Sequence, residues 1–138
     1  MMFVCNSNIH AQGPGKKEKL EALRIAFITK ELNLTSAEAQ TFWPVYNEYQ
    51  DKTDAARKAF RQQYKKNVDI NTLTDKEADS YIAAEIELKQ REASLFKEYM
   101  EKIKKVVGAK KTAKLRKAEE EFKQELLKIL KNSGTGSD

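Results

Sequence analysis

The chain has few of the residues that carry catalytic or metal-binding chemistry. Its 138 residues include one cysteine and one histidine, Cys5 and His10, both within the first ten positions. A lone cysteine cannot form an internal disulfide, and without a histidine cluster tight transition-metal binding is not expected. The five glycines form no phosphate-binding loop, and no nucleophile is patterned with a base. We therefore expect a protein that is not an enzyme and holds no cofactor or metal.

One metal site stays open at this point, a site made of carboxylates alone. It would require acidic side chains such as Glu85 to converge with Glu92 or Glu77 from different helices. Most of the acidic residues lie instead in charged helical patterns, of which residues 119–121 are an example, and such patterns are typical of a solvated face.

Helix breakers, strand patterns and long apolar runs are scarce as well. The chain has two prolines, and no apolar run approaches the ~20 residues that a membrane-spanning helix needs. Polar and apolar residues do not alternate as they do in half-buried strands. Hydrophobic residues make up 40% and charged residues 34% of the chain, which favours a charged helical domain over a disordered one. The sequence predicts a single all-α domain.

Four segments have the apolar spacing of helices, namely 16–33, 36–66, 75–107 and 110–131. Asn33 ends the first segment, and Gly108 is placed to cap the end of the third. Pro44 predicts a bend inside the second segment, where Trp43 is expected to pack between the first two helices. Segments 36–66 and 75–107 are long enough to pack antiparallel to each other. A second apolar stripe on 75–107 is consistent with a dimer.

The pattern Leu-Thr-x-x-Glu-Ala occurs twice, each time before one of the long helical segments. Each threonine is placed as an N-cap, and the glutamate three residues later can bond back to the backbone N–H of the cap. The leucine before the cap is placed to pack on the first turn. The residues expected to cap the helices are Leu34, Thr35 and Glu38 in the first copy and Leu73, Thr74 and Glu77 in the second.

The two ends of the chain differ from the helical middle. Residues 1–11 end in an alanine and resemble the end of a secretory signal peptide, although the charged start and the full apolar stretch are missing. A plain disordered N-terminus is the alternative. Residues 12–131 are expected to form the helical domain, and residues 132–138, rich in Gly and Ser, a flexible tail.

Basic residues and aromatic residues meet on the second helical segment. Three cations four residues apart lie beside two aromatic residues, and the set is Arg57, Phe60, Arg61, Tyr64 and Lys65. A basic face edged by aromatic rings attracts acidic or unfolded polypeptide first by charge and then by apolar contact. The alternative is a solvated face balanced by acids on neighbouring helices.

A second basic run has no acid over sixteen positions. Residues 102–117 contain eight lysines and arginines, and the whole chain has a net charge of +5. Such a run is compatible with an anionic lipid surface or with nucleic acid, which is our alternative to polypeptide binding. The net charge is too mild to require nucleic acid.

The two Leu-Thr boxes resemble those of the LTxxQ-motif periplasmic stress family, to which Spy and CpxP belong. The family usually has Gln where this chain has Glu38 and Glu77, and either side chain closes a capping box. Residues 25–35 and 42–49 are similar to a branch labelled as sensors of extracytoplasmic-function (ECF) sigma factors, and residues 114–122 also fit this branch. The resemblance extends over residues 16–131.

This resemblance implies a cradle-like dimer of long, bent, antiparallel helices that is exported to the periplasm. Members of the family hold unfolded clients on a basic, partly apolar concave face or restrain a membrane-bound stress-signalling protein. The resemblance thus implies a sensor or a Spy-like chaperone, with an unfolded or regulatory polypeptide as its partner. Contact with a membrane surface is compatible with it, and nucleic acid is not expected. The nickel- or cobalt-sensing branch uses histidine-rich sites that this chain lacks.

Overall fold

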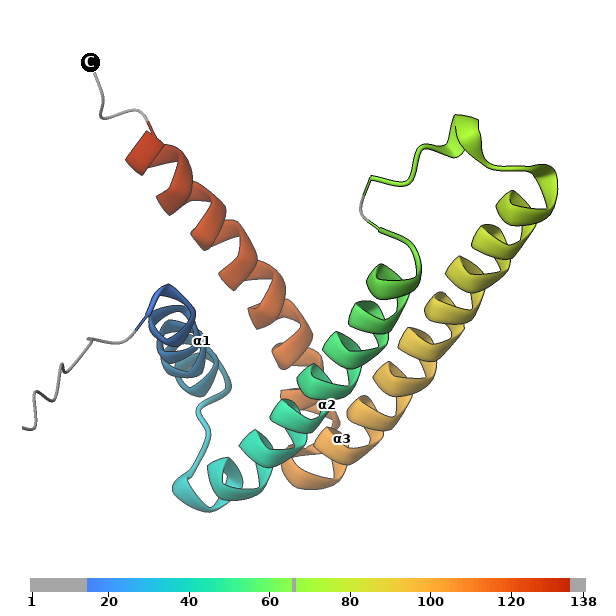
Figure 1. Cartoon of the computed structure of the whole chain (residues 1–138). Coiled ribbons are helices and arrows are strands. Elements are labelled where there is room, and N and C mark those ends of the chain that lie inside the picture. Colours follow the sequence, from blue (N-terminus) through green and yellow to red (C-terminus); the bar gives the residue numbers. More distant parts are fainter. Residues whose placement is uncertain (1–14, 66, 135–138) are drawn as a thin grey trace, which may run out of the picture.

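The computed structural model describes residues 15–65 and 67–134 (Figure 1). In these ranges the chain forms three α-helices and one short 3-10 helix: α1 (Lys16–Leu32), α2 (Ser36–Gln63), η1 (Ile70–Thr72) and α3 (Asp75–Gly134). No strand occurs in the described part of the chain, so the all-α prediction is confirmed. The leader expected in residues 1–11 lies outside the described residues.

The third helix bends back on itself at Gly108. This residue has φ 83° and ψ 166°, a backbone conformation open essentially to glycine alone. The residues on either side remain helical, so the two segments expected as separate helices form one element, and the predicted count of four helices is not confirmed. We call residues 75–107 the N-arm of α3 and residues 109–134 its C-arm.

Helix α2 and the N-arm of α3 form a long antiparallel hairpin (Figure 1). Contacts between them run in opposite chain directions, because the Lys102 amine bonds to Glu48 at the base and the Arg57 Nε bonds to Glu92 further along. Between these ion pairs the rings of Tyr49 and Tyr99 stack with centroids 4.2 Å apart. The ion pairs at the base are half exposed and contribute little stability, so packing of the helix faces holds the hairpin together.

Helix α1 packs on the C-arm, and the pair diverges from the long hairpin to give the molecule the outline of a V (Figure 1). The rings of Phe27 and Phe122 lie 5.5 Å apart across this second pair. The core fills the base of the V, where all three helices meet. Its buried members are Ile28, Leu32, Phe42, Tyr46, Tyr99, Ile103, Leu115 and Ala118.

Trp43, which was expected to pack between the first two helices, is half-buried and packs edge-on against Phe42, beside a core to which α1 also contributes. Two helix ends differ from the sequence prediction. Helix α2 ends at Gln63, three residues early, because Tyr64 adopts an extended backbone. Helix α3 continues to Gly134, so the first three residues of the expected flexible tail, 132–138, are helical. The backbone of α2 passes through Pro44 without leaving the helix.

Candidate functional site: the inner cleft

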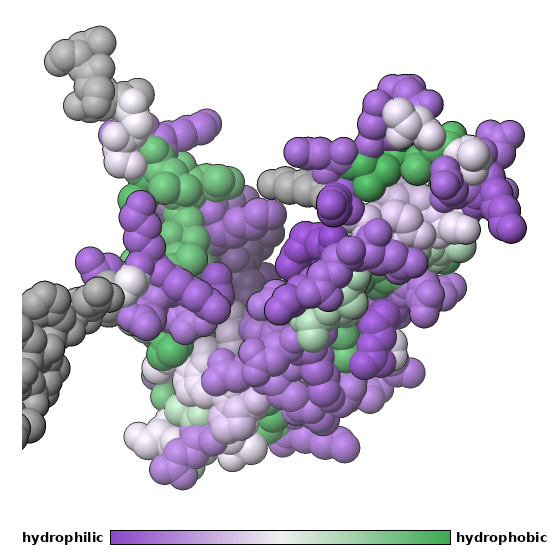
Figure 2. Space-filling model, in the orientation of Figure 1, coloured by the Kyte–Doolittle hydropathy of each residue, from purple (hydrophilic) through white to green (hydrophobic). Residues whose placement is uncertain are grey.

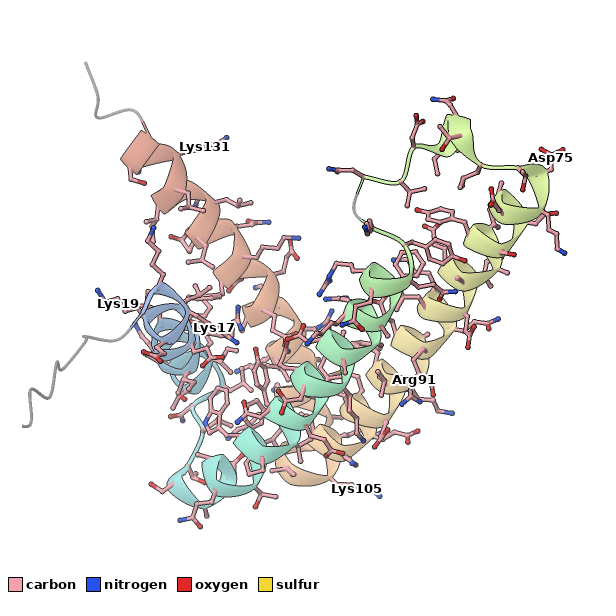
Figure 3. All side chains as sticks on the ribbon, viewed as in Figure 1. Lys17, Lys19, Asp75, Arg91, Lys105 and Lys131 are labelled. Carbon is pink, nitrogen blue, oxygen red and sulfur yellow. The ribbon has the colours of Figure 1, made fainter. Side chains whose placement is uncertain are left out.

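The space between the two pairs of helices contains a cleft of about 360 Å³, which we call the inner cleft. Figure 2 shows the molecule hollowed at this place, and Figure 3 shows side chains from both pairs of helices directed into it. All three helices contribute to its walls. The lining residues are Arg24, Ile28, Tyr46, Tyr49, Gln50, Thr53, Arg57, Arg116, Glu119, Glu120, Phe122, Lys123 and Leu126.

Cations outnumber carboxylates in the inner cleft. Its four cations are Arg24, Arg57, Arg116 and Lys123, and its two carboxylates are those of Glu119 and Glu120. Two of the cations are already paired, Arg57 with Glu92 and Arg116 with Glu119. Arg24 lies over the Phe122 ring, 5.7 Å from its centroid. Arg24 and Lys123 form no ion pair with any residue of the described ranges, so the cleft retains positive charge for a ligand.

The floor of the cleft is a partly buried polar cluster. The Tyr99 hydroxyl donates a hydrogen bond of 3.4 Å to Glu119 Oε1. Burial raises the pKa of Glu119, and the Arg116 guanidinium opposes this rise. Burial also raises the pKa of Tyr46 and of Tyr99, so both phenols stay neutral at physiological pH. The floor therefore offers aromatic rings and hydrogen-bonding groups, whereas the free charge lies on the walls.

One polar atom at this floor has no partner. The Thr53 hydroxyl is buried and forms no hydrogen bond, and the residue as a whole is 4% exposed. Burying a hydroxyl without a hydrogen bond costs free energy. Nothing in the sequence pattern of α2 marks this threonine as unsatisfied.

The structure separates the five residues expected to bind polypeptide. Arg57 lines the inner cleft, and its Nε lies 2.6 Å from Glu92 Oε1. Phe60 and Tyr64 form a cluster with Tyr81 of the N-arm, with ring centroids 5.9 Å and 5.0 Å from that of Tyr81. The remaining two, Arg61 and Lys65, are exposed and form no ion pair within the described part of the chain.

Phe60 lies on a different side of α2 from the inner cleft. It lines a groove of about 520 Å³ between α2 and the N-arm, together with Ala56, Leu88 and Arg91. Arg57 and Phe60 thus line two separate grooves. Sequence reasoning did not identify Tyr81 as the partner of the two aromatic residues, because a periodic pattern marks a face and not the residue opposite it.

Both capping boxes are formed. The Glu38 N–H donates to Thr35 Oγ1 over 3.1 Å, and the Thr35 N–H donates to Glu38 Oε1 over 3.4 Å. The matching distances in the second box, Thr74 with Glu77, are 3.2 Å and 2.8 Å. The two leucines before the caps, Leu34 and Leu73, are half-buried, the first of them against the core.

The first capping box has a further contact that the sequence did not predict. The Lys111 amine, on the C-arm of α3, lies 2.8 Å from Glu38 Oε1 and 3.1 Å from the Asn33 carbonyl oxygen. The hydrogen bond from Lys111 lowers the pKa of Glu38. The box that begins α2 therefore also joins the corner between α1 and α2 to the C-arm.

Half of the second basic run is neutralised within the chain. Four of its eight cations form ion pairs, which are Lys102 with Glu48 and Glu98, Lys111 with Glu38, Arg116 with Glu119 and Lys117 with Glu121. Pairing of this kind reduces the charge available for phosphates of a nucleic acid. Lys104, Lys105, Lys110 and Lys114 form no ion pair among residues 15–65 and 67–134.

Among the described residues, no group of three or more His, Cys, Asp or Glu side chains is arranged to hold a metal ion. Glu92, one of the carboxylates considered for such a site, pairs with Arg57 instead. In the same residues no helix combines the length and the apolar character that crossing a membrane requires.

Comparison with known proteins adds no relative. No family model, curated protein or solved structure matches this chain. The resemblance to the LTxxQ-motif family stays a prediction that rests on the motifs quoted for it.

Proposed function

We propose that this protein is a non-enzymatic, polypeptide-binding protein of the envelope stress response. It takes acidic or unfolded segments into the inner cleft, and binding continues along the exposed basic side of α2. The observation that carries the proposal is the lining of the cleft, in which unpaired cations on the walls surround an aromatic floor. Charge on such walls accelerates encounter with an acidic segment, and the rings beneath bury its apolar side chains.

The shape of the cleft supports a polypeptide over a small metabolite. The cleft is open along the space between the two pairs of helices (Figure 2), and so it can accept a chain that passes through it. Its polar groups come from all three helices around an open cleft, whereas small-molecule sites bury most of one ligand. The groups at the floor also lack a nucleophile activated by a base.

The physiological role follows the family resemblance. Either the protein holds unfolded clients as a Spy-like chaperone, or it acts as a sensor that regulates an ECF sigma factor pathway by binding a membrane-bound signalling protein. Location in the periplasm and assembly into a homodimer are part of this proposal and rest on the resemblance alone.

The test is an aggregation assay with an acidic client protein that unfolds in solution. The protein is titrated against the client at low and at moderate salt, and light scattering is recorded. We expect suppression near stoichiometric amounts, weakened by salt because screening reduces the attraction between exposed charges. Absence of suppression at both salt concentrations contradicts client holding and leaves the sensor role to be tested by capture of a membrane-bound partner.

Two variants and one control locate the binding surface. Lys123→Glu reverses a free charge in the cleft, and Arg61→Glu combined with Lys65→Glu reverses the exposed charges on α2 without breaking an ion pair. Lys19→Glu is the matched control, because Figure 3 shows Lys19 on α1 pointing away from the cleft. Both variants should suppress aggregation less than the control does. Equal suppression by all three proteins would remove the cleft and α2 from the proposal.

A further inference from the structure

An open groove lies where the two arms of α3 fold back on each other, next to Gly108. This elbow pocket has a volume of about 460 Å³, within the range of ~300–1,000 Å³ typical of small-molecule sites. The N-arm contributes one wall and the C-arm the other. The lining residues are Phe96, Lys97, Met100, Glu101, Lys104, Ala109, Thr112, Ala113 and Arg116.

The interior of the elbow pocket is apolar. Phe96 and Met100, both half-buried, form the wall on the N-arm, and Ala109 and Ala113 form the wall on the C-arm. The small alanine side chains leave the space open between the arms. The hydroxyl of Thr112 is occupied, since it donates to the Gly108 carbonyl oxygen over 2.7 Å. An apolar group placed here would meet side-chain carbon and a methionine sulfur.

Cations surround this apolar interior. Three of them, Lys97, Lys104 and Arg116, line the pocket, against the single carboxylate of Glu101. Arg116 lies over the Phe96 ring at 4.8 Å and pairs with Glu119. The two lysines are exposed and form no ion pair within the described residues, so their charge is available to a ligand.

The surroundings add to the positive charge. The acid-free run 102–117 is centred on the elbow, and Figure 3 shows Lys105 at this turn. Lys105 and Lys110, on either side of Gly108, are without an ion pair in the described part of the chain. An apolar cavity with a cationic rim is complementary to a molecule that has an apolar chain and one acidic end.

We propose that the elbow pocket binds a single-chain anionic amphiphile, an acyl chain that ends in a carboxylate or another acidic group. The chain lies between the two arms against Phe96 and Met100, and the acidic end contacts Lys97 and Lys104. This site is separate from the inner cleft except for Arg116, and the proposal does not depend on polypeptide binding.

Calorimetric titration with dodecanoate, below the concentration at which it forms micelles, tests this site. We expect one dodecanoate per chain and an affinity that falls as salt is added. Dodecyl maltoside has the same alkyl chain with a neutral head and should bind about tenfold more weakly or less well still. Equal affinity for the two probes, or uptake without a defined stoichiometry, would overturn the proposal.

Two changes in the pocket complete the test. Ala113→Glu places a carboxylate in the pocket at an exposed helical position, and it should weaken dodecanoate binding about tenfold or more. Ala55→Glu makes the same change at an exposed site on α2 outside the pocket and should leave the affinity unchanged. If circular dichroism shows that Ala113→Glu is misfolded, the double variant Lys97→Gln with Lys104→Gln tests dodecanoate binding instead, because it keeps the apolar walls of the pocket. Wild-type affinity in this double variant would refute the assigned contacts.

Discussion

Replacing Gly108 by alanine measures the free energy that the backbone conformation of the turn in α3 costs a residue with a side chain. A Cβ built at this position has no heavy atom within 4 Å, so the substitution meets no steric obstacle from neighbouring residues. The penalty is therefore that of the backbone, whose φ of 83° and ψ of 166° cost a non-glycine residue about 1–3 kcal/mol. Alanine also reduces the entropy of the unfolded chain, which offsets about 0.4–1 kcal/mol of this penalty. We expect a net destabilisation of about 1 kcal/mol, within a range of about 0–2.6 kcal/mol.

Gly134→Ala is the matched control for this prediction. Gly134 lies at the end of α3, also has no neighbour within 4 Å, and has no positive φ. Urea unfolding followed by circular dichroism should show a lower midpoint for Gly108→Ala and an equal or higher midpoint for Gly134→Ala. If the two variants are equally stable, the turn at Gly108 does not exist in solution in the form seen in Figure 1.

Two further predictions concern the floor of the inner cleft. Thr53→Val keeps the branched shape and removes the unpartnered hydroxyl, so urea unfolding should show a gain of about 1 kcal/mol; a loss would indicate an unseen partner. Burial raises the pKa of Glu119 above that of the unfolded chain, despite the opposing charges of Arg116 and Arg24 and the hydrogen bond from Tyr99. The stability that the neutral carboxyl provides is therefore present below the unfolded pKa and is lost as pH rises through the folded pKa. As pH rises above the unfolded pKa, Glu119→Gln should therefore become more stable relative to wild type, and a relative loss of stability would contradict the assigned shift.

The starts of α2 and α3 and the end of α1 were the most predictable part of this fold. A threonine followed three residues later by a glutamate specifies a helix start through local hydrogen bonds, and α2 and α3 begin directly after Thr35 and Thr74. Asn33 ends α1 with φ 48°, a left-handed conformation that asparagine tolerates. Gly108 predicted a helix break because glycine, like asparagine, tolerates a positive φ. The direction in which the chain continues after such a break depends on tertiary packing, so the folding back of the C-arm at Gly108 was not predicted.

The candidate site was less predictable because its parts come from distant positions. Arg57 and Phe60 are three residues apart on α2 and share roughly one side of an isolated helix. In the folded chain the N-arm contacts both residues, Arg57 through Glu92 and Phe60 through Tyr81, but only Arg57 also lines the inner cleft. Lys111 and Glu38 are separated by 73 positions, and no local pattern brings them together.

The two proposed sites share one residue, and this decides how they can be told apart. Arg116 contacts Glu119 in the inner cleft and the Phe96 ring in the elbow pocket, so a change at Arg116 would perturb both sites. Lys123 lines only the cleft, whereas Ala113 lines only the elbow pocket. If the sites act independently, Lys123→Glu weakens client binding and leaves dodecanoate binding intact, and Ala113→Glu does the reverse. Loss of both activities in either variant would instead show that the arms of α3 couple the two sites through Arg116.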